Sequence, residues 1–175
     1  SSDLTTSYVK AASVDVVMKQ GLGTFSIAKK IAADYANQVA AGVTFTVAFD
    51  YELPANTDQY PNWTAPAGTL NPDKRTGTAT MEVEPGQTTP AYSKGFPTGT
   101  KISNLHEELS TANRALPDGY VWKEPKFTIG STPTTGLTIE DQKNTKVDLL
   151  NTVGPADKGR FSVTKTVAGD AGADA

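Results

Sequence analysis

Hydrophobic and polar residues alternate along several short stretches of the chain, which is the pattern of half-buried β-strands. In residues 25–31, Phe25, Ile27 and Ile31 fall on one face together with Lys29, while the residues between them fall on the other. Thr, Val and aromatic residues, which favour extended backbone, are concentrated in the same stretches. The pattern predicts strands at residues 25–31, 44–51, 78–84, 101–107, 120–122, 126–129 and 146–152.

Two stretches also carry a helical signal. Residues 28–40 are rich in alanine, which allows a short helical turn near residues 35–39. Residues 107–116 carry apolar side chains at helical spacing, so a helix competes there with the strand before it. Fifteen glycines and 11 prolines leave little room for longer helices. We therefore predict an all-β fold, an Ig-like or prealbumin-like β-sandwich of about seven strands with short helical insertions.

Composition narrows the classes of function. The 175 residues suffice for one domain, and the net charge of −3 without any basic run argues against nucleic acid and membrane partners. The apolar runs are too short to span a membrane. The lack of cysteine excludes disulfides and thiolate metal sites, and the presence of a single histidine, His106, argues against a His-dependent hydrolase or a multi-histidine metal site. We expect no metal and no cofactor, and we expect His106 to point away from the site described below.

Parts of the sequence resemble each other at a spacing of about one domain. Residues 23–34 align with residues 159–170 at an offset of 136, and residues 4–18 align with residues 137–151 at an offset of 133. Both matches stand in the order that tandem repeats would produce, although chance similarity between Thr- and Val-rich strands is the alternative.

The repeat predicts how the chain is divided. Residues 1–20 would be the closing strand of a preceding repeat or an N-terminal linker, and residues 21–154 a complete domain. Residues 155–175 would be a linker and the opening strand of a following repeat, so the expected partners are neighbouring repeats of the same polypeptide. Lys165 is the counterpart of Lys29, which makes it the candidate crosslink lysine of the next repeat.

Three polar residues fall on the predicted apolar faces. Lys29 lies in line with the apolar residues of its strand, Asn151 shares a face with Leu149, and Glu107 shares one with Leu105. Burying an unpaired charge costs several kcal/mol, which favours neutral forms of both the amine and the acid. A neutral Lys29 could attack the carboxamide of Asn151, with Glu107 as proton shuttle, and form an isopeptide bond. The alternatives are an ion-paired trio that does not react and a lysine whose head reaches the edge of the sandwich.

In the order of its motifs the chain resembles the collagen-adhesin B-type (Cna B-type) repeats of Gram-positive, especially actinobacterial, surface and pilus-like proteins. The motifs that carry the resemblance are Phe25-Ser-Ile-Ala-Lys29, Val43-Thr-Phe-Thr-Val47, Val83-Glu-Pro-Gly-Gln87, Phe96-Pro-Thr-Gly-Thr100, Glu107-Glu108-Leu109, Tyr120-Val-Trp122 and Val147-Asp-Leu-Leu-Asn151-Thr152.

The resemblance implies a spontaneous bond between Lys29 and Asn151, promoted by Glu107. It also implies a structural stalk or spacer repeat at the cell surface or in the cell wall. Such a repeat modifies itself once and is not an enzyme, and a host protein or glycan would be bound through another domain.

The neighbouring residues keep two assignments open. Lys30 and Glu108 are adjacent to the favoured residues and would replace them if a β-bulge shifted the register. Ile102 and Leu105 are three residues apart, which indicates such a bulge.

The rival class of function is a ligand-binding module, either an adhesin domain for a host protein or glycan or an accessory module of a secreted hydrolase. Tyr60 and Trp63, in a loop rich in proline and asparagine, are the candidate platform for stacking against a sugar.

Overall fold

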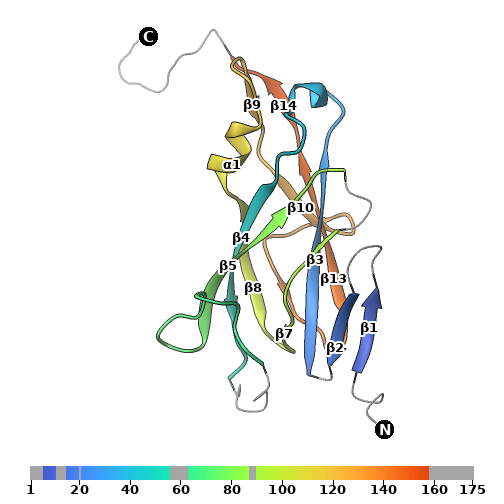
Figure 1. Cartoon of the computed structure of the whole chain (residues 1–175), viewed down its shortest axis with the longest axis vertical. Helices are drawn as coiled ribbons and strands as arrows, with labels where there is room; N and C mark the ends of the chain where they lie inside the picture. The colour runs from blue at the N-terminus through green and yellow to red at the C-terminus, as the bar shows by residue number, and fades with distance from the viewer. Residues whose placement is uncertain (1–5, 11–14, 20, 56–62, 87–89, 158–175) are drawn as a thin grey trace.

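The computed structural model describes residues 6–10, 15–19, 21–55, 63–86 and 90–157, and over these ranges the chain is a β-sandwich (Figure 1). The first strands are β1 (Thr6–Lys10), β2 (Asp15–Lys19), β3 (Leu22–Ile31), β4 (Phe45–Glu52), β5 (Thr76–Val83), β6 (Ala91–Tyr92) and β7 (Phe96–Pro97). The later strands are β8 (Lys101–Glu107), β9 (Tyr120–Trp122), β10 (Lys126–Ile129), β11 (Thr132–Pro133), β12 (Leu137–Thr138), β13 (Asn144–Asn151) and β14 (Val153–Pro155). The helical elements are the 3-10 turn η2 (Ala36–Gln38) and the helix α1 (Leu109–Arg114).

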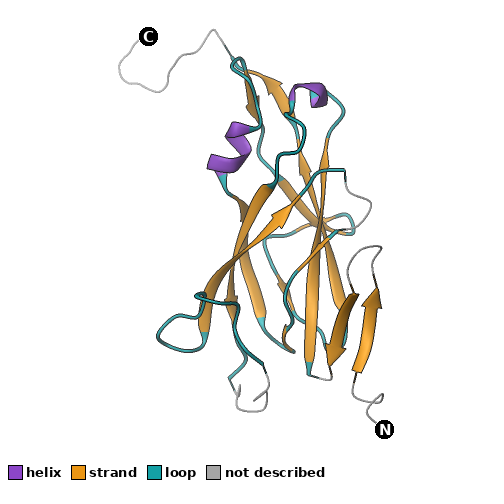
Figure 2. Cartoon of the chain, in the orientation of Figure 1, coloured by secondary structure: helices purple, strands orange, loops and turns teal. Residues whose placement is uncertain are grey.

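Two sheets face each other and enclose the core (Figure 2). One has the strand order β11-β10-β13-β3-β6, with β7 also paired to β3, and the other has the order β12-β8-β4-β5. The small sheet β14-β9 lies at one end of the molecule, and β1 and β2 form a hairpin beside β3 (Figure 1). The long strands β3 and β13 pair in parallel, which the long stretch of chain between them allows.

All seven predicted strands are present, as β3, β4, β5, β8, β9, β10 and β13. The two competing signals at residues 107–116 are both realised, because β8 ends at Glu107 and α1 begins two residues later. The helical turn predicted near residues 35–39 is η2.

The alternation did not predict seven of the strands. Five of them, β6, β7, β11, β12 and β14, contain two or three residues, too few to show a period. The other two, β1 and β2, fall in residues 1–20, where one closing strand or a linker is predicted. Two of the two-residue strands contain a proline, Pro97 in β7 and Pro133 in β11. Both strands contain only two residues and extend the outer parts of a sheet, where a missing backbone N–H is tolerated.

A β-bulge in β8 sets the register of the strand. Ala48 of β4 lies opposite His106, whereas Asp50 lies opposite Ser103, so β8 contributes one residue more than β4 between these pairs. Within this interval Asn104 has a positive φ of 53°, a conformation that Asn tolerates better than most residues. The bulge predicted from the spacing of apolar residues is therefore confirmed.

The consequence of the bulge is that Ile102, Leu105 and Glu107 all face the interior, while His106 is exposed, as expected. Without the extra residue the alternation would turn Glu107 outward. The interior that these residues join is built mainly from aromatic and β-branched side chains, of which the largest fully buried ones are Tyr51, Phe25, Phe45, Phe49, Phe96, Ile27, Ile139, Leu149, Val47, Val83 and Val147.

Candidate functional site

Three strands bring one polar side chain each into the core. Lys29 belongs to β3, Glu107 is the last residue of β8, and Asn151 is the last residue of β13. In the parallel register Leu149 lies opposite Lys29, and Asn151 lies two residues further along on the same face. Lys29, Glu107 and Asn151 are 4%, 6% and 0% exposed, so the structure buries all three residues that the alternation singled out.

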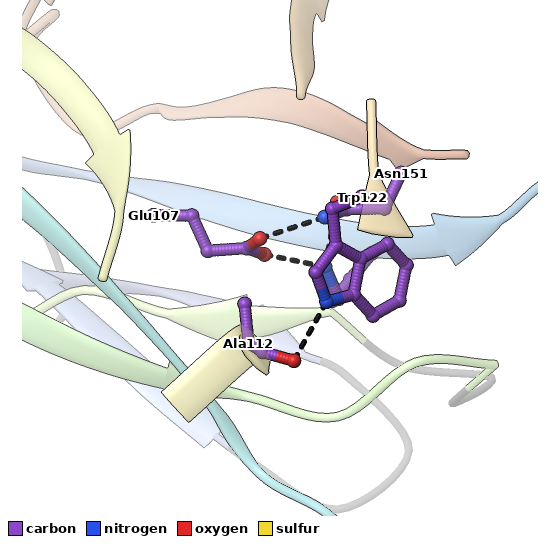
Figure 3. A network of polar contacts seen from close by, with 5 residues as sticks. Glu107, Ala112, Trp122 and Asn151 are labelled. Atoms are coloured by element: carbon purple, nitrogen blue, oxygen red, sulfur yellow. Dashed lines mark hydrogen bonds and ion pairs between the residues drawn. The ribbon is translucent and has the colours of Figure 1, made fainter. Parts of the chain in front are cut away.

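The three side chains form a closed ring of polar contacts. Lys29 Nζ lies 2.5 Å from Glu107 Oε2 and 2.6 Å from Asn151 Oδ1. Asn151 Nδ2 donates a hydrogen bond of 2.7 Å to Glu107 Oε1 (Figure 3). The carboxyl group therefore contacts the amine nitrogen with one oxygen and the carboxamide nitrogen with the other.

Two aromatic rings also lie close to the amine. Lys29 Nζ lies 4.1 Å from the ring centroid of Phe45 and 5.9 Å from that of Trp122. The two rings meet edge to face, with centroids 5.7 Å apart. Ring faces attract a cation but offer it no hydrogen-bond acceptor, so the polar partners of the amine come from the trio itself.

This apolar environment acts on the protonation of the amine. Burial lowers the pKa of the Lys29 ammonium below its usual value, while the hydrogen bond and the charge of Glu107 act in the opposite direction. The net effect of the two is a lowered pKa, because desolvation is the larger of them. The neutral, nucleophilic form of this lysine is therefore easier to reach than that of a lysine in water.

The geometry also meets the requirements of an amide exchange. The amine is hydrogen-bonded to Oδ1 of Asn151, the atom bonded to the carbon that a nucleophile would attack. The leaving nitrogen, Nδ2, is already hydrogen-bonded to the acid that could protonate it. Fixing the reacting groups in contact can replace a large part of the entropic barrier of such a step.

The structure distinguishes the favoured residues from their neighbours. Lys30 is exposed on the outer face of β3. Glu108 is half-buried beyond the end of β8, where its backbone N–H donates to Thr46 O at 2.8 Å, and it takes no part in the ring of contacts around Lys29. Lys165, the candidate of the following repeat, lies outside the described residues.

The predicted sugar platform is only partly described. Tyr60 lies outside the described residues. Trp63 is half-buried, its Nε1–H donates to Gly95 O at 2.7 Å, and its ring lies 6.1 Å from that of Phe96. This indole packs against the core instead of standing free on the surface, as ring faces that stack against sugars must.

The aromatic part of the site is not evident from the sequence. Phe45 and Trp122 were assigned to strands but not to the surroundings of Lys29, because contacts between strands cannot be read from alternation within each strand. The available signal was indirect, since both residues belong to the motifs that carry the family resemblance.

No group of three or more His, Asp or Glu residues suited to a metal ion occurs in the part of the chain that the structure describes. Over the same ranges, no helix has the length and apolar character needed to cross a membrane.

The comparisons with known proteins give a family and a distant structural likeness. A family model described as "Domain of unknown function (DUF5979)" matches residues 25–154, so the chain belongs to this family. No curated protein matches the sequence. Among solved structures, the chain is similar to a pilus-presented adhesin, Spy0125 (Cpa), with 14% sequence identity and a TM-score of 0.40. The match covers 74% of this chain and 26% of the adhesin, so the chain spans about a quarter of that protein's length.

Proposed function

We propose that this member of the DUF5979 family is a stalk or spacer repeat of a bacterial surface adhesin or pilus-like protein, stabilised by a Lys29–Asn151 isopeptide bond that forms without an enzyme. One observation carries the proposal. A single buried carboxyl group, that of Glu107, contacts both the nitrogen that would attack and the nitrogen that would leave. An ion pair needs only the first of these contacts, whereas an amide exchange uses both.

The proposed reaction balances without any co-reactant. Glu107 takes a proton from the Lys29 ammonium, and the neutral Nζ attacks Cγ of Asn151. The attacking nitrogen then gives up a second proton to Glu107 as Glu107 delivers the first one to Nδ2, which leaves as ammonia, so Glu107 ends the reaction as a neutral acid. The Cγ–Nδ2 bond is broken, the Nζ–Cγ bond is formed, and nothing is oxidised or reduced.

The position of the bond in the fold suits a structural function. It would join β3 to β13, the long strands near the two ends of the domain, across 122 residues of sequence. A repeat closed in this way resists unfolding and proteolysis, which a stalk exposed outside the cell requires. The single modification leaves no site for turnover, so the proposed role is not enzymatic. The resemblance to Cna B-type repeats supports the same assignment and a location at the cell surface.

Intact-mass spectrometry of the recombinant chain tests the chemistry. The folded wild-type chain should be lighter than its sequence by one ammonia. Lys29→Ala and Glu107→Ala should both have the unmodified mass, because one lacks the nucleophile and the other the acid. Fragmentation after proteolysis should yield a branched peptide that joins Lys29 to Asn151.

The adjacent residues provide matched controls. Lys30→Ala and Glu108→Ala remove the same residue types one position away, outside the ring of contacts, and both variants should keep the ammonia deficit. A folded wild-type chain of unmodified mass would refute the bond and leave an unreacted buried trio.

The rival class, a ligand-binding module, has less support. A groove of about 1150 Å³ runs between β8 and β10. The one Phe, Tyr or Trp that lines it is Phe127, which is 8% exposed and so presents little ring face. Trp63, the described half of the predicted platform, packs against Phe96 elsewhere. These features favour the stalk over a sugar-binding module.

A further inference from the structure

A hydrogen bond outside the polar trio ties the helix α1 to the aromatic wall of the site. The indole Nε1–H of Trp122 donates to the backbone carbonyl of Ala112 at 2.6 Å (Figure 3). Trp122 is half-buried, whereas the Lys29 side chain against which it lies is 0% exposed. The indole therefore stands at the boundary between the amine and the solvent.

The chain connects this contact to the other two members of the trio. The helix α1 begins two residues after Glu107, and its Ala112 is 1% exposed, packed into the core. Trp122 ends β9, which pairs with β14, and β14 begins two residues after Asn151. The bond between Trp122 and Ala112 thus joins the segment that follows the acid to the segment that follows the carboxamide.

We propose that Trp122 and α1 form a latch: the indole N–H bond to Ala112 holds the ring between the Lys29 amine and water, and the isopeptide bond forms at its full rate only when this latch is closed. The inference rests on the proposed function. It makes Trp122 a positioning residue, which acts through the amine and does not exchange protons or bonds with it.

The physical reason is desolvation of the amine. A ring that excludes water destabilises the charged ammonium and so raises the fraction of neutral amine that can attack. The N–H bond matters because it fixes the orientation of the ring against the buried carbonyl of Ala112, which also accepts a hydrogen bond from Ala115 N–H at 3.1 Å. Opening the latch would admit water to Lys29 and leave more of it protonated.

The groups that face the amine are few. Within the described residues, the titratable group in contact with Lys29 Nζ is Glu107 from β8. The other elements packed against the amine contribute Asn151 from β13, Phe45 from β4 and Trp122 from β9, none of which titrates. A shift in the pH dependence of the reaction on changing Trp122 would therefore report on the amine and its acid.

The test is a refolding time course. The full chain and its variants are recovered from inclusion bodies in denaturant, before they have folded, and are checked for the unmodified mass. They are then diluted into buffers of different pH, stopped with acid at intervals and weighed by mass spectrometry. Folding is followed in parallel by circular dichroism. Trp122→Ala should lose ammonia about tenfold more slowly at neutral pH, because a higher pKa of the amine lowers the neutral fraction that can attack. The midpoint of its pH–rate profile should lie at a higher pH than that of the wild type, and Trp122→Phe should lie between the two.

Trp63 provides the matched control. It too is a half-buried indole that donates to a backbone carbonyl, but it packs against Phe96 and not against the trio. Trp63→Phe should therefore react at the wild-type rate with an unchanged pH midpoint.

The outcomes separate the latch from the proposed function. A wild-type chain that folds without losing ammonia refutes the proposed function. If the wild type reacts and Trp122→Ala reacts equally fast, or more slowly by the same factor at every pH, the latch is refuted. Should Trp122→Ala fail to fold, the same comparison is made with Trp122→Phe, which keeps a ring but lacks the N–H.

Discussion

At the scale of single residues, the trio holds an acid and an amine that depend on each other. Glu107 is buried against Lys29, and the side chains of the two residues are 1% and 0% exposed. Water therefore cannot take the place of either partner. Removing one member of such a pair costs about 3–5 kcal/mol, mainly because the other is left charged and unpaired, whereas apolar replacement of both is often tolerated.

This asymmetry gives a prediction on stability. Lys29→Met should be less stable than the double variant Lys29→Met/Glu107→Leu, although the double variant has lost one more native polar side chain. Neither protein can form the crosslink, so the bond itself does not enter the comparison. Denaturant unfolding at neutral pH measures the difference, and a double variant less stable than the single one would contradict it.

The lowered pKa of Lys29 predicts how stability depends on pH in a chain that cannot react. In Asn151→Ala the amine persists, with an ordinary pKa of 10.5 in the unfolded chain and a lower one in the folded chain. Between these two values the unfolded chain binds more protons, so the free energy of unfolding should rise with pH across this window. Asn151→Ala/Lys29→Met serves as the control and should lack this part of the rise. Equal slopes in the two proteins would show that the amine titrates normally when folded.

At the scale of elements, the bulge in β8 decides which glutamate enters the core. Asn104 supplies the extra residue and has a positive φ, which is costly for a β-branched side chain. Asn104→Val should therefore destabilise the fold by about 1–2 kcal/mol, whereas Asn104→Gly should be close to neutral because glycine adopts this φ freely. Thermal unfolding of both variants in the unreactive Asn151→Ala background measures this. A valine variant as stable as the glycine variant would mean that β8 does not need the bulge.

The same strand shows what could be predicted from sequence and what could not. Alternation placed Lys29, Glu107 and Asn151 on inward faces, and the irregular spacing of Ile102 and Leu105 indicated the bulge. Both inferences use one strand at a time. Which strands pair, and in which direction, depends on contacts distant in sequence, so the parallel pairing of β3 with β13 was not predicted. For the same reason the position of Trp122 over the amine became visible only in three dimensions.

At the scale of the whole molecule, the proposed bond closes a loop of 122 residues. By analogy with disulfides, closing a loop of this size removes entropy from the unfolded chain worth about 4–5 kcal/mol. The crosslinked wild type should exceed Glu107→Gln in unfolding free energy by at least this amount, because the variant also leaves the buried Lys29 amine without its carboxylate partner. Glu107→Gln keeps the shape of the side chain but cannot act as the acid, so it should retain the unmodified mass. Equal unfolding midpoints in guanidinium would refute the stabilising role.

A stalk repeat, the role proposed above, would be loaded along its length, and the topology shows how tension would pass through the chain. Force applied by the preceding chain enters at the start of β3, and force from the following chain enters at the end of β13 and β14, near the opposite end of the molecule (Figure 1). Because β3 and β13 are parallel neighbours, such tension shears their hydrogen bonds together. With the isopeptide bond in place, the path from Lys29 to Asn151 is covalent and the residues between them carry no tension.

In single-molecule pulling, the wild type should therefore lack the extension of roughly 400 Å that releasing 122 residues would give. Asn151→Ala should show that extension after a force peak of its own, and an identical extension in the wild type would exclude a covalent path between the two strands.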